Sequence, residues 1–173
     1  MTFTENSILA LIACRRARRP ARNLLVLGKL FEQLACCGLA EATQTEERIW
    51  DVWMHHPHRA AAEVLELATR DIAARRYDIA ETRLARLLRS APDFAEALHK
   101  RAALYYLLGR DAECLHDIGR TLELEPRHFA AMLHFAEILL GEGAHADACF
   151  AFRAALSLHP NLPRAREALS DNP

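Results

Sequence analysis

Three prolines, Pro92, Pro126 and Pro160, are separated by an unvarying 34 residues. Small and apolar residues recur at fixed places around each of them, and no insertion or deletion interrupts the spacing. A repeat of this length is typical of helical hairpins that stack into a solenoid. Because one hairpin cannot bury its apolar face alone, neighbouring hairpins share a continuous core and leave an extended concave surface. The period therefore predicts an all-α fold with a surface suited to binding another chain.

The period divides most of the chain into three units, 61–94, 95–128 and 129–162. Small residues stand at the eighth and twentieth places of every unit: Ala68, Ala102, Ala136, Ala80, Cys114 and Ala148. Larger apolar residues stand at the fourth and twenty-fourth places: Val64, Leu98, Met132, Leu84, Ile118 and Phe152. Helices approach closely where small residues face them, and large side chains fill the spaces that remain. The alternation predicts two packed helices in each unit.

This pattern resembles the tetratricopeptide repeat (TPR) family. The second unit matches the family at Leu98, Ala102, Tyr105, Gly109, Ile118 and Pro126. The third unit matches it at Met132, Phe135, Ala136, Gly143, Ala148, Phe152, Ala155 and Pro160. Arg101, Asp71 and Leu87 depart from the family pattern. The resemblance implies a right-handed α-solenoid of three TPR helical hairpins.

Three shorter segments resemble a group of small proteobacterial TPR proteins. They are the run IWDVW at 49–53, the run PDFAEALHKRAALYYLLGR at 92–110, and the run LELEPRHFAA at 122–131. This second resemblance suggests a bacterial source and implies no substrate.

Glycines and prolines mark the expected ends of the helices. Gly109 and Gly143 fall between the two helices of their units, where a residue at positive φ can end a helix. Each repeat proline follows an apolar helical run, which it cannot continue. Two pairs have the form of a capping box and predict helix starts: Asp93 with Glu96, and Thr43 with Glu46.

The segments that flank the units are expected to close the ends of the solenoid. Residues 23–60 read as an N-terminal helical cap, a decayed repeat that covers the open apolar face of the first unit. Residues 163–173 read as a short C-terminal helix and tail. Residues 1–22 form a basic leader, disordered or targeting, whose arginines make a solvated arm or else contact anionic lipid or nucleic acid. These arginines are Arg15, Arg16, Arg18, Arg19 and Arg22.

The leader also bears on location. The run Leu11-Ile12-Ala13-Cys14 has the form of a bacterial lipoprotein cleavage site. However, Glu5 precedes this run and the arginines follow it, which is the wrong polarity for a signal peptide. No apolar stretch approaches the roughly 20 residues that a transmembrane helix needs. We predict a cytoplasmic protein, with export to the periplasm as the alternative.

Composition argues against chemistry. Apolar residues make up 51% of the chain and the net charge is −1, which predicts one soluble domain without a strong nucleic-acid or membrane footprint. The five cysteines show no CxxC pairing and suit reduced thiols. The sequence lacks a GxSxG elbow, a phosphate-cradling glycine loop and an HExxH motif. We predict a protein that is not an enzyme and has no cofactor.

The TPR resemblance also implies where a ligand would lie. In that family, the fifth, ninth and twelfth residues of the first helix of each unit face the groove. Here the candidate groove residues are Leu65, Thr69, Ile72, His99, Ala103, Tyr106, Leu133, Glu137 and Leu140, joined by Lys100 and His134 at the sixth place. The residues that let some relatives clamp a peptide carboxylate are missing. We therefore expect an apolar segment or an amphipathic helix as ligand.

The predicted function is accordingly a non-catalytic protein–protein interaction module, such as an adaptor, scaffold or co-chaperone. Its partner is another protein or a peptide, with no small-molecule substrate. Two alternatives stay open. The chain is a structural solenoid that assembles into a homo-oligomer through its end faces, or it is a histidine-rich metal-binding protein that uses His55, His56 and His58.

His99 and His134 stand on the first helices of adjacent units, so we expect them to lie near one another. Imidazole has an ordinary pKa of about 6.5. If both rings titrated there, protonation would weaken the binding of an apolar ligand, and the affinity would fall in mildly acidic buffer.

Overall fold

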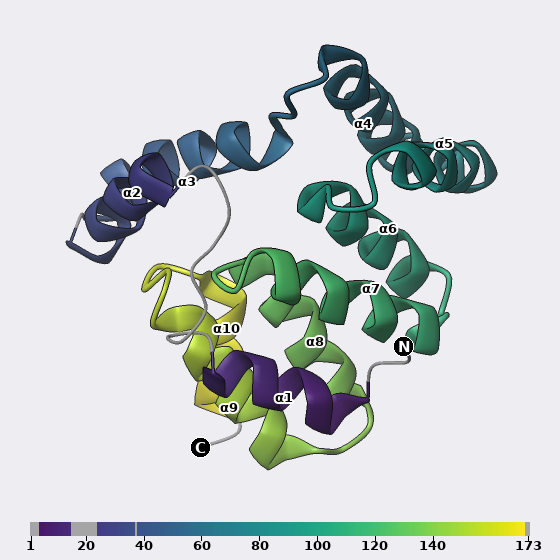
Figure 1. Ribbon diagram of the computed structural model, residues 1–173. Coiled ribbons are helices and arrows are strands. Elements are labelled where there is room, and N and C mark those ends of the chain that lie inside the picture. The colour runs from purple at the N-terminus through teal and green to yellow at the C-terminus, as the bar shows by residue number, and fades with distance from the viewer. Residues whose placement is uncertain (1–3, 15–23, 37, 172–173) are drawn as a thin grey trace.

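The computed structural model describes residues 4–14, 24–36 and 38–171. Within these ranges the chain forms ten helices and no strand (Figure 1). The helices are α1 (Glu5–Cys14), α2 (Leu24–Cys36), α3 (Leu39–Met54), α4 (Arg59–Ala73), α5 (Tyr77–Ser90), α6 (Ala95–Leu107), α7 (Asp111–Leu124), α8 (Phe129–Gly141), α9 (His145–Leu156) and α10 (Pro163–Asp171). No helix of these ranges is long and apolar enough to cross a membrane.

Three helical hairpins, α4–α5, α6–α7 and α8–α9, stack in chain order (Figure 1). This arrangement confirms the all-α, TPR-like solenoid. Each of the three repeat prolines follows the end of a hairpin's second helix, as expected of a residue that cannot continue one. Gly109 and Gly143 have φ values of +66° and +78° and separate the two helices of their hairpins, which confirms their predicted conformation.

Gly143 offers a test of this turn. We expect Gly143→Ala to lower the free energy of unfolding by about 1 kcal/mol, because a Cβ disfavours positive φ even where space is open. Gly141, two residues earlier, ends α8 in a helical conformation. Replacement of Gly141 by Ala should leave the free energy of unfolding unchanged or raise it by roughly a few tenths of a kcal/mol, because alanine favours a helix. Urea denaturation followed by circular dichroism measures both, and equal losses would contradict the role of φ.

Ion pairs explain two of the departures from the family pattern. Asp71 of α4 accepts hydrogen bonds from Arg76 at 2.7 Å and from Arg83 of α5 at 2.7 Å. Arg101 of α6 donates to both carboxylate oxygens of Asp117 of α7, at 2.6 and 2.8 Å. Both carboxylates are almost completely buried. Each pair therefore joins the two helices of one hairpin through charge, where the family pattern would use apolar contact.

Helix α1 lies where the sequence predicts a leader. Its Ile8 and Ile12 are buried, and α1 packs against α7 and α9, the second helices of two hairpins (Figure 1). The two isoleucines are one helical turn apart, so they form a short apolar stripe on the side of α1 that packs against α7 and α9. Residues 15–22, which include the arginines, lie outside the described part of the chain. The predicted basic arm is therefore untested.

Helices α2 and α3 form a hairpin that precedes the solenoid, but they do not simply cover the first unit. Trp50 and Trp53 of α3 contact α6 and the start of α8. Leu67 of α4 and Ile79 of α5 stay 41% and 46% exposed, so apolar surface of the first unit remains uncovered. The aromatic side chains of α3 thus pack where other rings are available. We call α2–α3 the N-terminal hairpin.

Both capping-box predictions are wrong. Helix α6 has Phe94 as its N-cap and no side-chain cap, while α3 begins at Leu39, four residues before Thr43. Glu96 and Glu46 point instead to histidines in loops, His128 before α8 and His159 after α9. Their carboxylates are used in tertiary contacts and not at helix ends.

Candidate functional site

A row of four neighbouring rings begins at α3 and continues along the first helices of the second and third units. Trp50 of α3 lies over His99 of α6, with ring centroids 5.9 Å apart. His99 stacks on His134 of α8 at 5.1 Å, and His134 stacks on Tyr106 of α6 at 5.9 Å. We call Trp50, His99, His134 and Tyr106 the ring row. It confirms the expectation that His99 and His134 are neighbours.

The second tryptophan of α3 makes its own stack beside this row. The indole of Trp53 lies parallel to the imidazole of His128, with centroids 4.1 Å apart and planes 9° apart. Phe129, the first residue of α8, packs against both tryptophans and against Phe31 of α2. Three aromatic side chains of the N-terminal hairpin therefore pack against His128 and Phe129 at the start of α8.

A buried carboxylate supports these rings from within. Glu96 of α6 has a fully buried side chain. Its oxygens lie 2.8 Å from Nε2 of His128, 3.1 Å from Nζ of Lys100 and 3.4 Å from Nδ1 of His99. Burial acts to raise the pKa of the Glu96 carboxyl, but the adjacent His99 and His128 hold that pKa well below its usual range. Glu96 is therefore an ionised carboxylate that contacts His128, Lys100 and His99.

The hydrogen bonds of His128 determine its tautomer. Its Nδ1 accepts the backbone N–H of Ala131 at 3.2 Å, which makes His128 the N-cap of α8. The proton of the ring is therefore on Nε2, which donates it to Glu96. One side chain thus begins a helix, satisfies the buried carboxylate and supports Trp53.

Glu96, His99 and His128 also place three potential metal-ligand atoms within 4.8 Å of one another. The hydrogen bonds fit a metal poorly, because Nε2 of His128 carries a proton while its Nδ1 accepts the amide of Ala131. In addition, the Lys100 ammonium already lies beside the carboxylate. The three residues are better described as a hydrogen-bonded core than as a metal centre.

The histidines that the sequence offers as metal ligands, His55, His56 and His58, lie between α3 and α4. The Nδ1 atom of His56 accepts the backbone N–H of His58 at 3.1 Å, and the ring of His56 packs against Phe94. Among the described residues these histidines belong to no group of three candidate ligand atoms. Their contacts are those of a connecting segment.

A further contact joins α3 to the far end of the third unit. Glu46 accepts hydrogen bonds from Nε2 of His159 at 3.1 Å and from Nε1 of Trp50 at 3.1 Å. The hydrogen bond from His159 is the largest cause that lowers the pKa of the Glu46 carboxyl, against the opposing effect of burial. Nδ1 of His159 in turn accepts the amide of Asn161. One face of α3, from Glu46 through Trp50 to Trp53, is thus in contact with the repeats.

The candidate groove residues of the first unit differ in their exposure. Leu65 is completely buried and packs in the core, so it is not accessible to a ligand in this conformation. Thr69 donates its hydroxyl to the carbonyl of Leu65, and Ile72 is half-buried. Of the three, Thr69 and Ile72 therefore have surface that a ligand could contact.

In the second and third units, the candidate residues divide into a covered part and an open part. His99 is buried beneath α3, and Lys100 lies over the Trp50 ring at 4.8 Å. Glu137 pairs with Arg164 of α10 at 2.7 Å. The remaining candidates are half-buried: Ala103, Tyr106, Leu133, His134 and Leu140. We call Ala103, Tyr106 and Leu140 the open groove.

The expected titration of His99 and His134 near pH 6.5 is wrong. Burial lowers the pKa of His99 to about 3, although Glu96 attracts its charged form. Burial also lowers the pKa of His134 to about 4, and the charges of Arg164 and Lys100 add to this. Both rings therefore stay neutral in mildly acidic buffer. A ligand on the ring row would not be released there by their protonation.

Sequence reasoning missed the residues that organise this site. The sequence pattern predicts Glu96 and Glu46 as helix caps and assigns no role to His128 or His159. It also predicts the tryptophans of α3 as part of a terminal cap. A usable signal was a histidine close to two of the three repeat prolines, since His128 follows Pro126 by two residues and His159 directly precedes Pro160.

Comparison with known proteins agrees with the fold. No family model matches the chain. It is 33% identical over 79 residues to a TPR repeat-containing protein of Rhizobium etli, and the aligned stretch covers 46% of this chain. The chain matches 39% of that protein's length. Together with the stacked hairpins, this similarity confirms the resemblance to TPR proteins.

Proposed function

We propose that the chain is a non-catalytic protein-interaction module that binds an apolar segment or an amphipathic helix on the first helices of its repeats. A helical-repeat relative and a solenoid fold support the general role. The supporting observation for the ligand class is that α3, an amphipathic helix of the chain itself, packs two indoles on these same elements. A surface that accepts one such helix has the shape and the ring stacking for another.

The open groove is the place where a partner would add contacts. Tyr106 and Leu140 are half-buried, and the Tyr106 ring stacks on His134 at one end of the ring row. Aromatic and apolar anchors of this kind often carry most of an interface's binding energy. By contrast, His99 is wedged between Trp50 and Glu96, so its replacement would disturb the fold and the site together.

The test is a Tyr106→Ala, Leu140→Ala variant compared with the wild-type chain. We expect a partner captured from an extract of the source organism to bind the variant at least about tenfold more weakly, as loss of two anchors predicts. Phe150→Ala serves as the control, because Phe150 is an exposed aromatic residue of α9, a second helix of its hairpin. Mass spectrometry identifies the partner and calorimetry measures its affinity. A partner that binds all three chains equally would contradict the proposal.

A further inference from the structure

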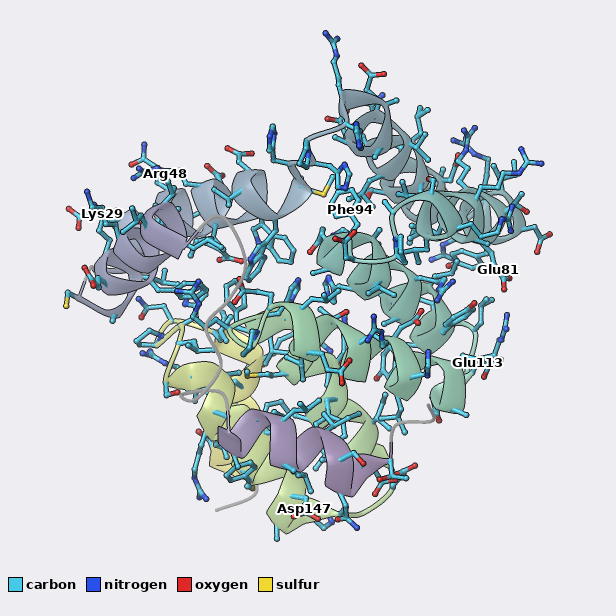
Figure 2. The ribbon with its side chains drawn as sticks, in the orientation of Figure 1. Lys29, Arg48, Glu81, Phe94, Glu113 and Asp147 are labelled. Atoms are coloured by element: carbon cyan, nitrogen blue, oxygen red, sulfur yellow. The ribbon has the colours of Figure 1, made fainter. Side chains whose placement is uncertain are left out.

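The N-terminal hairpin presents one face of α3 to the repeats as a bound ligand would. Glu46, Trp50 and Trp53 are spaced by four and three residues, so they share one face of the helix. They contact, in order, His159 in the loop after α9, His99 of α6, and His128, the N-cap of α8. The opposite face is polar, and Arg48 of α3 and Lys29 of α2 point away from the repeats (Figure 2). The hairpin is therefore amphipathic, with its anchors directed at the repeats.

The N-terminal hairpin is packed incompletely against the repeats. The indole of Trp53 is 6% exposed, yet among the described residues no acceptor is placed to receive its Nε1 proton. A buried donor without a partner destabilises the packed state, because it has lost its hydrogen bonds to water without gaining another. An open cleft of about 280 Å³ also lies between the hairpin and the repeats, lined by Leu27, Val52, Trp53, Phe94 and Glu96. Both features weaken the contact of the hairpin with the repeats relative to a well-packed core.

The connection to the solenoid allows the hairpin to move as a unit. Helix α3 ends at Met54 and α4 begins at Arg59, and the intervening segment is extended at both His55 and His58. Pro57 keeps this segment from joining the two helices into one. Helix α4 has its own apolar core with α5 and α6, centred on Leu65 and Leu84. Of α3, Met54 packs against this cluster, so departure of α3 would leave most of that core in place.

We propose that α3 is a displaceable internal occupant of the partner-binding surface. The partner is an amphipathic helix that carries the same recognition pattern, two aromatic residues three apart with an acidic residue four positions before the first. This inference rests on the proposed function and names its ligand. A partner helix that also reaches Tyr106 and Leu140 and supplies an acceptor for buried donors would gain contacts that α3 lacks. In the free protein, α3 shields the rings from water and from weaker ligands.

The test uses a fluorescent peptide with the sequence of α3, Leu39–Met54, and the full chain. Wild-type protein is compared with a Trp50→Ala, Trp53→Ala variant, after circular dichroism has shown equal helicity. We expect the variant to bind the peptide at least about tenfold more tightly, because the tethered helix competes at a millimolar-range effective concentration in the wild-type chain. A peptide with both tryptophans changed to alanine is the control and should bind neither chain. A folded variant that binds the peptide no better than the wild type does would overturn the inference.

Amide hydrogen exchange of the wild-type chain decides the matter even if that variant fails to fold. If α3 opens without the repeats, its amides exchange at least about tenfold faster than those of α8. Exchange of α3 and α8 at one common rate would show a single cooperative unit and would also overturn the inference. The proposed function has a separate readout, since a partner lost from the Tyr106→Ala, Leu140→Ala variant supports it whatever the α3 peptide does.

Discussion

Replacement of Glu96 by alanine is expected to lower the free energy of unfolding by about 3 to 5 kcal/mol, the usual cost of removing one member of a buried charged network. The side chain is fully buried, and it accepts a 2.8 Å hydrogen bond from His128. Without the carboxylate, the Nε2 proton of His128 has no acceptor, and the Lys100 ammonium loses the anion 3.1 Å away. The parallel stack of Trp53 on His128 would lose its support as well.

Urea denaturation followed by circular dichroism measures this loss, and Glu63→Ala is the matched control. Glu63 is a glutamate of α4 that pairs with Arg59 at 2.7 Å, but both side chains are exposed. An exposed pair within a helix contributes less than about 0.5 kcal/mol. If Glu96→Ala and Glu63→Ala cost the same, the buried network does not stabilise the protein as its geometry indicates.

The repeat period was sufficient to predict the three hairpins, because the residues that define it are the ones that pack the helices against each other. Ala102, Ala136 and Ala148 are all fully buried, as expected at points of close approach. The ion pairs Asp71–Arg83 and Arg101–Asp117 were not predicted. Their members come from different helices, and a sequence pattern that describes one helix face carries no information about a charged partner on the next.

The positions of α1 and α3 could not be derived from the sequence for a related reason. An apolar stripe such as Ile8 and Ile12 predicts a helix that packs against something, but several surfaces of a solenoid are apolar. The N-terminal hairpin reaches the second and third units because the flat ring of His128 and the side chain of Phe129 match the indole of Trp53. Such complementarity arises only in the folded chain.

The candidate site shows the same division. The repeat register predicted that His99 and His134 lie close together. It did not predict that both rings stay neutral in mildly acidic buffer. Sequence position alone could not show that α3 covers His99 or that Glu96 lies beneath it. Burial decides the protonation of both rings, since removing an imidazolium from water costs more than the nearby carboxylate returns.

Acid should therefore destabilise the protein well before its carboxylates titrate. The pKa of His99 is lowered to about 3 and that of His134 to about 4, whereas both are near 6.5 in the unfolded chain. Between these values the unfolded chain binds more protons than the folded one, so stability falls as the pH is lowered through 6.5. The charged and titratable groups around the two rings are Glu96, Lys100, His128, Glu137 and Arg164.

Each depressed histidine removes about 1.4 kcal/mol per pH unit below its unfolded pKa, so we expect a loss of about 2 to 3 kcal/mol between roughly pH 7.5 and 5.5. Urea denaturation at the two pH values measures it. A His134→Asn variant should show about half of this pH dependence, because one titrating ring remains. His145→Asn, at the exposed start of α9, should keep all of it. Stability that does not change over this range would mean that water reaches both rings, and that α3 does not cover the site in solution.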